Sequence, residues 1–529
     1  MGEASVDATC AFCETRATQK CGGCKSVYYC SREHQKKHWK LHSKVCKAFK
    51  LTKDKTLGRH YVATRKIDVG EIVIKDENPL IAGPMHSTVP VCLNCYVVLT
   101  AKTAVPCEKC GWPLCLECKS HGPECEFTMK NKGTKVSITD FGLPHPTYRC
   151  ICAVRALCLK NEHPEMYRKL LQLEDHCDLA TRDMDYAFEK PLELARFIKR
   201  FFKVEDIRDE EIARIAGILQ VNGHEVPITE PPYMAVYDLS SYLEHNCRAN
   251  CSKTFTSTGG VIVRAVLPIQ KGDHISICYT DPLWGLTSRR HHLLQTKFFE
   301  CSCERCKDPT EFGMMYNAIL CTKGECGGSM LPPTFIYQGN QPPDFVCDKC
   351  KNTSPWDQVE QMIEKIGQEL AAMKKDNVDA CKKFINRYRK LLHENHFYLT
   401  DVKVALAQII GQQSTGLPTV NDDLLGEKII LCQKLNDILK TLVPAENRIR
   451  GLILFEMHAA LAEFGRRQGK EELRGILMES RKFLAEAYEL LRYEPEILPE
   501  GQVAIHAKNN LQQIDVLIKA LCQNAVTPM

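Results

Sequence analysis

Hydrophobic and polar positions alternate in two segments that lie about 200 residues apart. Residues 60–76 (HYVATRKIDVGEIVIKD) contain an alternating run, a glycine turn at Gly70 and a second run, and residues 261–280 (VIVRAVLPIQKGDHISICYT) repeat this pattern around Gly272. Alternation is typical of strands with one buried face, and a glycine beside an acidic residue is typical of the turn between two strands. The pattern predicts two hairpins that pair in one small β-domain, with the residues between them forming an insertion.

A different periodicity begins at Trp356, where apolar positions recur at helical spacing. Val359, Ile363, Ile366 and Leu370 would lie on one helix face. Further helices are predicted in residues 379–393, 424–442, 448–467, 471–492 and 502–523. Residues 147–235, between the two alternating segments, are also predicted to be helical. The C-terminal pattern favours paired helices, although no clean 34-residue repeat is present.

Thirty cysteines among 529 residues change this picture. Such a content is typical either of a secreted disulfide framework or of an intracellular metal protein. The opening residues lack the basic and apolar regions of a signal peptide, and no run of eighteen apolar residues occurs. We therefore expect an intracellular zinc protein without a membrane span, divided into several folding units.

The net charge of +5 is distributed unevenly. Residues 1–60 carry 10 Lys and 3 Arg against 5 acidic residues, a net charge of +8. A basic module could bind nucleic acid or an acidic partner, but clustered lysines more often form a solvated face. Direct nucleic-acid binding is therefore the less favoured alternative.

Cysteine pairs with the spacing of zinc ligands are concentrated first in residues 10–46, which hold ligands for two tetrahedral sites. We assign one site to Cys10, Cys13, Cys30 and His34. The second, interleaved site would consist of Cys21, Cys24, His42 and Cys46. A segment this short, with few aliphatic residues, needs metal to fold.

Three further clusters follow. A second set of eight ligands comprises Cys92, Cys95, Cys107, Cys110, Cys115, Cys118, His121 and Cys125, and partial metallation of this set is the alternative. Cys301, Cys303 and Cys306 lack a fourth ligand, for which we predict Cys247. A zinc ribbon is indicated by Cys321, Cys326, Cys347 and Cys350. About six zinc sites are thus expected, and the remaining cysteines are expected to be core thiols.

The cysteine pattern of residues 10–46 resembles a MYND zinc finger, with His34 where that family usually has cysteine. The two alternating segments, the run LEHNCRANC at 243–251 and the later FFECSCERC resemble a SET domain with its post-SET cysteines. Together, GRHYVATRKIDVGEIVIKDENPLIAGP and ISICYTDPLWGLTSRRHHLLQTKFFECSCERC make the chain similar to the SMYD family of SET and MYND proteins. A second MYND-like module within the SET region resembles the arthropod branch of that family.

This resemblance implies an α+β multidomain fold, in which a zinc-stabilised split SET β-fold carries MYND zinc fingers and a C-terminal α-helical, TPR-like domain. The expected division is 1–50 for the MYND finger, 56–90 for the N-terminal part of SET, 91–128 for the inserted MYND-like module, 129–235 for a helical SET insert, 236–284 for the C-terminal SET core, 285–312 for the post-SET segment, 313–355 for a zinc-ribbon-like segment and 356–529 for the helical C-terminal domain.

The resemblance also implies a protein-lysine N-methyltransferase that transfers methyl groups from S-adenosylmethionine to histones or other proteins. A lysine with a pKa near 10.4 is neutral in only about one molecule in 2,500 at pH 7, so such a site must favour the neutral amine. Tyr279 is the expected catalytic residue, and Tyr237 is expected to line the lysine channel. The expected cofactor-binding residues are Arg59, His60, Asn222, Ser241, Leu243, Glu244, His245, Tyr279 and Phe299.

Two residues depart from the family pattern. Glu244 stands where the family has asparagine, and an ionised carboxylate accepts hydrogen bonds but cannot donate them. It could still hold the cofactor's ammonium group by a charge-assisted bond. His60 adds a side chain to the glycine loop. An inactive or weakly active scaffold that recruits peptide partners is therefore the alternative function.

The MYND resemblance implies binding of proline-containing peptides or corepressors, and with it a role in transcriptional repression. We expect a monomer that is present in the cytoplasm and the nucleus.

Overall fold

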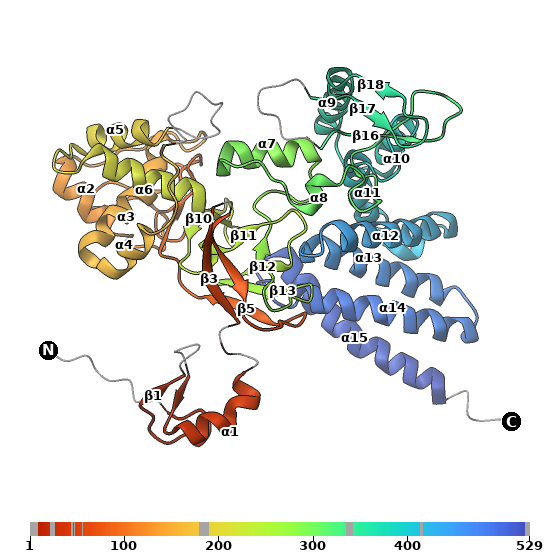
Figure 1. Ribbon diagram of the computed structural model, residues 1–529, viewed down its shortest axis with the longest axis horizontal. Coiled ribbons are helices and arrows are strands. Elements are labelled where there is room, and N and C mark those ends of the chain that lie inside the picture. The colour runs from red at the N-terminus through yellow and green to blue at the C-terminus, as the bar shows by residue number, and fades with distance from the viewer. Residues whose placement is uncertain are drawn as a thin grey trace.

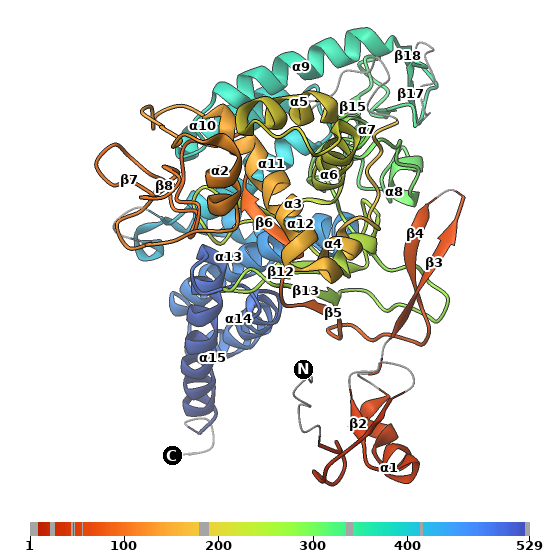
Figure 2. The same ribbon diagram turned by 90° about the vertical axis from the view of Figure 1, so that its left-hand side faces the viewer.

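The computed structural model describes residues 9–21, 27–43, 46, 48–55, 57–178, 190–334, 342–412 and 416–523. A small N-terminal finger lies apart from a larger body (Figure 1). In that body a central β-region has the helices α2–α6 (between residues 124 and 222) on one side and the array α12–α15 (residues 422–523) on another. Figure 2 shows the β3–β4 pair (Phe49–Asp54 and Gly58–Ala63) at the edge of the body above the finger. None of the helices in these ranges is long and apolar enough to cross a membrane.

The N-terminal finger has almost no aliphatic core. It contains β1 (Gln19–Lys20), β2 (Tyr28–Tyr29) and α1 (Arg32–His42). The Ser31 hydroxyl accepts a hydrogen bond from the backbone N–H of His34 at 3.1 Å and so caps α1. The buried cluster consists of Cys10, Ala17, Cys21, Tyr29 and Cys46. Since cysteines make up most of this cluster, apolar burial alone cannot account for the fold.

The two alternating segments lie together, as predicted, but neither forms a hairpin. The strands are β3 (Phe49–Asp54), β4 (Gly58–Ala63), β5 (Ile72–Asp76), β11 (Glu244–His245), β12 (Cys251–Phe255), β13 (Val261–Ala265) and β14 (Ser276–Ile277). Strand β4 pairs with β3, while β5 joins the antiparallel order β12-β13-β5. Strand β14 runs parallel to β11. The hairpin prediction is therefore wrong, because the strands of each segment pair outside that segment.

Reciprocal hydrogen bonds join the two glycine turns. The backbone N–H of Gly70 donates to the carbonyl of Ala265 at 2.8 Å, and the N–H of Gly272 donates to the carbonyl of Ala63 at 2.9 Å. Both glycines have positive φ, 87° and 96°, which a residue with a side chain adopts only with strain. The alanine precedes the glycine by the same number of residues in both segments. This equal spacing allows the glycine turn of each segment to bond to the alanine of the other in the same way.

The insertion forms a helical layer over a second sheet. Its helices are α2 (Glu124–Lys132), α3 (Ile151–Glu162), α4 (Pro164–Leu170), α5 (Pro191–Phe202) and α6 (Asp209–Asn222). The strands are β6 (Ile81–Pro84), β9 (His224–Val226) and β10 (Tyr233–Val236) in the order β6-β10-β9, with the short pair β7 (Val105–Pro106) and β8 (Pro113–Leu114) in the cysteine module. Residues 224–236 thus contain strands rather than the predicted helix.

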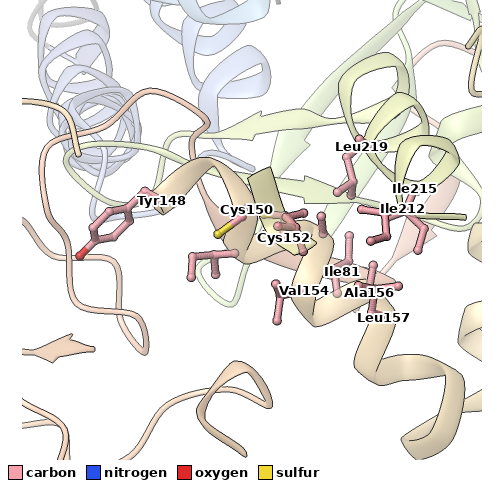
Figure 3. Packing of buried hydrophobic residues seen from close by; sticks show 14 of the residues in the cluster. Ile81, Tyr148, Cys150, Cys152, Val154, Ala156, Leu157, Ile212, Ile215 and Leu219 are labelled. Carbon is pink, nitrogen blue, oxygen red and sulfur yellow. The ribbon is translucent and has the colours of Figure 1, made fainter. Parts of the chain in front are cut away.

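The core of this layer, drawn in Figure 3, packs α3 and α6 against Ile81 of β6. Cys150 and Cys152 are buried in it as the predicted core thiols. A Cβ atom added to Gly83 would lie 2.5 Å from the Cys152 sulfur, so this glycine allows α3 to approach the sheet closely. Cys251, Cys381 and Cys432 are likewise buried.

From residue 286 onward, the described part of the chain is helical apart from one small sheet and its connecting loops. The strands β15 (Ile319–Leu320), β16 (Ser329–Leu331), β17 (Phe345–Cys347) and β18 (Thr353–Ser354) pair in sequence order. The helices are α7 (Leu286–Lys297), α8 (Glu304–Lys307), α9 (Trp356–Ala372), α10 (Val378–Tyr388), α11 (Phe397–Ile409), α12 (Asp422–Leu442), α13 (Asn447–Arg466), α14 (Lys470–Leu491) and α15 (Pro499–Gln523). Among the described residues, 3₁₀ turns occur at η1 (Pro146–Cys150) in the insertion, at η2 (Ser240–Tyr242) before β11 and at η3 (Leu417–Thr419) before α12. The predicted C-terminal helices are confirmed, and α11 was missed.

A buried ion cluster connects the post-SET segment to the SET core. The Glu311 carboxylate, 1% exposed, accepts hydrogen bonds from Arg289 at 2.8 Å, Arg305 at 2.6 Å and Asn317 at 2.6 Å. Arg305 also donates to the Pro282 carbonyl at 2.7 Å. Both guanidinium groups are fully buried, so removing their shared anion would leave two uncompensated charges.

We expect Glu311→Ala to lower the free energy of unfolding by about 3–5 kcal/mol, because it strands the Arg289 and Arg305 charges in the interior. Chemical denaturation followed by circular dichroism measures this loss. The matched control is Glu77→Ala, which removes only an exposed ion pair with Lys75 and should leave the free energy of unfolding nearly unchanged. Equal effects of the two substitutions would contradict the assignment.

Candidate zinc centres and SET site

Five groups of four candidate ligands converge so that their ligand atoms lie within 4.8 Å of one another. These are Cys10, Cys13, Cys30 and His34; Cys92, Cys95, Cys115 and Cys118; Cys107, Cys110, His121 and Cys125; Cys247, Cys301, Cys303 and Cys306; and Cys321, Cys326, Cys347 and Cys350. Each group has the number and type of ligands of a closed zinc site. The second cluster, which sequence spacing left unsorted, divides into two interleaved groups.

The sixth predicted group is only partly described. Cys21 and Cys46 bring their sulfur atoms to 3.8 Å, and His42 is buried nearby on α1. Cys24 lies outside the described residues. The described members therefore agree with the predicted interleaving as far as they extend.

Within the inserted cysteine module, His121 is held from its far side by a buried carboxylate. Its Nε2 lies 3.1 Å from the Cys110 sulfur, and its Nδ1 lies 2.8 Å from Glu124 Oε1. Glu124 is also bonded to Arg155, whose guanidinium holds the pKa of that carboxyl down to about 2 against the effect of burial. A carboxylate behind a histidine ligand fixes the ring's orientation and tautomer and so favours metal binding.

The post-SET group joins distant parts of the chain. The Cys247 sulfur lies 3.5 Å from that of Cys306 and 3.9 Å from that of Cys301. Cys247 follows strand β11, whereas the other three cysteines follow α7. A metal bound here would attach the post-SET segment to the SET core, and the fourth ligand chosen from the sequence lies beside the other three.

Tyr279 is connected to this sulfur group through His245. The backbone N–H of Tyr279 donates to His245 Nδ1 at 3.0 Å, and His245 Nε2 lies 3.2 Å from the Cys247 sulfur. Because Nδ1 accepts a hydrogen bond, the neutral ring carries its proton on Nε2, toward the sulfur. Burial lowers the pKa of His245 to about 3, in agreement with a neutral ring. The post-SET cysteine group that contains Cys247 thus helps, through His245, to orient the backbone at Tyr279.

The Tyr279 hydroxyl donates to the backbone carbonyl of Leu243. Burial raises the pKa of the phenol, and the Glu244 carboxylate adds to that effect. The phenol therefore stays protonated near neutral pH. The Phe299 ring stands 5.7 Å from the His245 ring, and the His245 ring stands 5.3 Å from that of Tyr279, so these three predicted residues lie together.

A second part of the predicted cofactor set converges on Glu174. Arg59 donates to the Glu174 carboxylate at 2.8 Å, and the Asn222 amide donates to the Glu174 carbonyl at the same distance. The Arg59 guanidinium also lies 5.2 Å from the ring centroid of Tyr242. Glu174 and Tyr242 were missed, and their local sequence carries no motif that would have marked them.

The two residues that depart from the family pattern share a neighbour. Glu244 Oε2 lies 2.7 Å from His274 Nδ1, and the His274 ring stacks on His60 with centroids 4.6 Å apart. His60 is buried on β4 and directs its Nδ1 toward the Gly58 carbonyl at 3.2 Å. Burial raises the pKa of Glu244, partly offset by His274. His274, not singled out from the sequence, thus occupies one face of the Glu244 carboxylate.

Other predicted residues serve the backbone around this site. The Ser241 hydroxyl donates to the Tyr237 carbonyl at 2.6 Å, and Leu243 is buried. The Tyr237 side chain is 0% exposed, and its hydroxyl donates to the Gly259 carbonyl. The structure therefore places Tyr237 in the core, whereas a side chain that lines an open channel must be accessible.

A cavity of about 280 Å³ opens between β12 and the C-terminal helices. Its wall includes Cys278 and Thr280, the two neighbours of Tyr279. Its acidic residues are Glu225, Glu446 and Glu494, and burial raises the pKa of Glu494 to about 7. The sequence did not indicate this cavity, because its wall combines residues that are more than 200 positions apart.

The split β-fold, its post-SET sulfur group and the separate N-terminal finger define a SET protein with a MYND finger. Residues 10–46 match the MYND finger family, and residues 58–280 match the SET domain family. With relatives that carry both names, these matches show that the chain belongs to the SMYD family of SET and MYND proteins.

Three relatives illustrate the range of similarity. The Drosophila melanogaster SET domain-containing protein SmydA-8, isoform A, is 27% identical over 308 residues, which cover 56% of this chain and 64% of the relative. The Arabidopsis thaliana histone-lysine N-methyltransferase ASHR1 is 23% identical over 82% of this chain and 89% of the relative. The human histone-lysine N-methyltransferase SMYD3 is 38% identical, but over only 14% of this chain and 17% of the relative. The Drosophila match fits the arthropod branch.

We expect about six zinc ions per chain, since the ligand sets described above would each hold one ion and Cys24 would complete the sixth. Elemental analysis of the purified protein gives the zinc concentration, and quantitative amino-acid analysis of the same sample gives the protein concentration. Their ratio is the number of zinc ions per chain. Three ions or fewer would mean that some of the converging cysteines are free thiols.

We expect Glu124→Gln to weaken zinc binding at the His121 group by about 10- to 100-fold, because the substitution removes the anion that orients His121. Competition with a chromogenic chelator should then release one zinc ion per chain more readily than in the unmodified protein. Glu126→Gln is the matched control, since Glu126 is an exposed residue of the same helix. Identical release from both variants would contradict this role of Glu124.

Proposed function

We propose that this protein is a protein-lysine N-methyltransferase that uses S-adenosylmethionine. The supporting observation is the position of Tyr279, whose backbone is tied through His245 to the Cys247 sulfur group and whose phenol donates to the Leu243 carbonyl. Relatives named as lysine methyltransferases match 82% and 70% of this chain.

The residues around Glu244 fit a cofactor with a cationic amino acid moiety. The side chain of Glu244 is only 12% exposed, and its one ion-pair partner in the described ranges is His274, which is charged only when protonated. A desolvated carboxylate with so weak a partner favours a bound cation. Glu244 would therefore hold the ammonium group, and the Phe299 ring would supply an apolar face. The cofactor supplies a methyl group on a sulfonium sulfur.

The protein's own residues would position the acceptor amine and exclude water. A protonated phenol at Tyr279 can accept a hydrogen bond from an amine without removing its reactive lone pair. Backbone carbonyls near the phenol orient the remaining N–H groups. Such positioning contributes much of the rate in a displacement reaction, because the reacting atoms must be aligned in line.

The substrate class follows from the charge of the cavity between β12 and the C-terminal helices. Three carboxyl groups, those of Glu225, Glu446 and Glu494, outnumber the two cationic side chains of the same wall, Lys253 and Arg448. Basic segments of histones or of other proteins would complement this charge.

The MYND finger would recruit proline-containing peptides or corepressors, with a role in transcriptional repression. The protein would act as a monomer, and it would be present in the cytoplasm and the nucleus.

A catalytically inactive scaffold is the second candidate. The observation that favours it is the Glu244–His274 contact, which uses part of the carboxylate that the cofactor would need. Likewise Arg59 and Asn222 are both bonded to Glu174. In this case the finger and SET region would bind partners without transferring a methyl group.

We expect Tyr279→Phe to reduce methyl transfer by about 10²- to 10⁴-fold, because it removes the hydroxyl that positions the amine while retaining the ring. Incorporation of labelled methyl from S-adenosylmethionine into histones and cell-extract proteins measures the rate. Zinc content and the unfolding midpoint should not change, which separates a chemical role from a structural one.

Calorimetric titration with S-adenosylmethionine distinguishes the two candidates. The methyltransferase proposal requires saturable binding, which Tyr279→Phe should largely preserve. Absence of binding by a fully metallated, folded protein would favour the scaffold, and undiminished transfer by Tyr279→Phe would remove Tyr279 from its proposed role.

A further inference from the structure

Two lysine side chains from separate elements lie near Tyr279, one over its ring and one in the adjoining cavity. Lys297, the last residue of α7, places its Nζ 5.8 Å from the centroid of the Tyr279 ring. Lys253, on β12, lines the cavity and places its Nζ 3.3 Å from His224 Nδ1. Neither lysine forms an ion pair within 4 Å among the described residues, although Glu225 and Glu446 lie in the same cavity wall as Lys253 and act on it electrostatically.

The contacts of Lys297 resemble those that an acceptor lysine needs. Its Nζ donates one hydrogen bond to the backbone carbonyl of Val221 at 2.6 Å. Val221 directly precedes Asn222, one of the expected cofactor-binding residues. A carbonyl accepts one N–H and leaves the lone pair of a neutral amine available. The side chain is partly exposed rather than sealed in the core.

The surroundings also favour the neutral form of this amine. Burial lowers the pKa of Lys297 to about 8, and the nearby Lys253 contributes to that shift. At pH 7 about one-tenth of the Lys297 side chains would then be neutral, roughly two hundred times the fraction of an ordinary lysine. Burial likewise lowers the pKa of Lys253.

We propose that Lys297 is a methyl acceptor of this protein's own SET site, so that the chain methylates itself at this residue. The proposal depends on the methyltransferase function proposed above. The lone pair of the Lys297 amine forms the new N–C bond, the S–CH3 bond of S-adenosylmethionine breaks with its electrons retained by sulfur, and the displaced proton passes to water. The products are methyl-lysine and the neutral thioether.

Lys297 is favoured over Lys253 as the acceptor because of what each amine contacts. The amine of Lys297 lies over the ring of Tyr279, whereas that of Lys253 lies 5.3 Å from the centroid of Phe255 and near His224. Lys253 instead supplies the positive charge that disfavours protonation of Lys297. The competing structural role for Lys297, completing the carbonyl contacts at the end of α6, would not make it a methyl acceptor.

The test is incubation of the purified, metallated full-length chain with trideuteromethyl-labelled S-adenosylmethionine, followed by digestion and mass spectrometry. We expect label on the peptide that contains Lys297, at least a hundredfold less label in Tyr279→Phe, and none at this position in Lys297→Arg. Lys253→Arg is the matched control, since it keeps the positive charge and should leave Lys297 labelled.

Mixing identifies the reaction as intramolecular. Full-length Tyr279→Phe protein, distinguished by a mass tag, should remain unlabelled at Lys297 when incubated with active protein, because its amine lies inside its own site. Label on the inactive partner would overturn the intramolecular proposal.

A parallel reaction with histones and extract proteins separates the two possible failures. Transfer to an added protein with Lys297 unlabelled would overturn self-methylation while leaving the methyltransferase function intact. No transfer to any protein, together with no cofactor binding by calorimetry, would overturn both proposals. Label on other lysines alone would also overturn the assignment to Lys297.

Discussion

The tetrahedral demand of zinc for four converging ligands is the constraint on which this structure depends. Cys247 lies 54 residues before Cys301, yet their sulfur atoms are 3.9 Å apart. A metal held by this group would fix the post-SET segment against β11. Through His245, the same group reaches the backbone of Tyr279. Metal binding and the geometry of the proposed methyl-transfer site are therefore coupled by two hydrogen-bonding contacts, and loss of one should disturb the other.

Backbone interlocking provides the second connection between distant segments. The turns at Gly70 and Gly272 exchange hydrogen bonds with Ala265 and Ala63, and this closes the β-region around the insertion. The insertion contributes its own core and cysteine groups on one side of the site, while the C-terminal helices and β12 line the cavity on another. Lys297 of α7 lies over the Tyr279 ring, and Lys253 of β12 lines the cavity beside it, so side chains from separate parts of the chain meet near this phenol.

Much of the local structure could be predicted because its causes are local. Helical periodicity located most of the C-terminal helices, and ligand spacing grouped the cysteines, since both depend on neighbouring residues. Helix α11 was missed because buried side chains such as Leu399, Val402 and Leu406 are mixed with other apolar residues, so that no clear polar face marks it. The hairpins were wrong because alternation identifies a strand but not its partner.

The sequence by itself determined the residue types of the site: paired thiolates that bind zinc, glycines that allow positive φ, and a tyrosine after the second alternating segment. Only the tertiary structure decided which groups meet. It placed His274 against Glu244, Glu174 against Arg59, and Lys297 over Tyr279. The physical reason is that charge and hydrogen-bonding interactions depend on distance in space, whereas a single sequence records only distance along the chain.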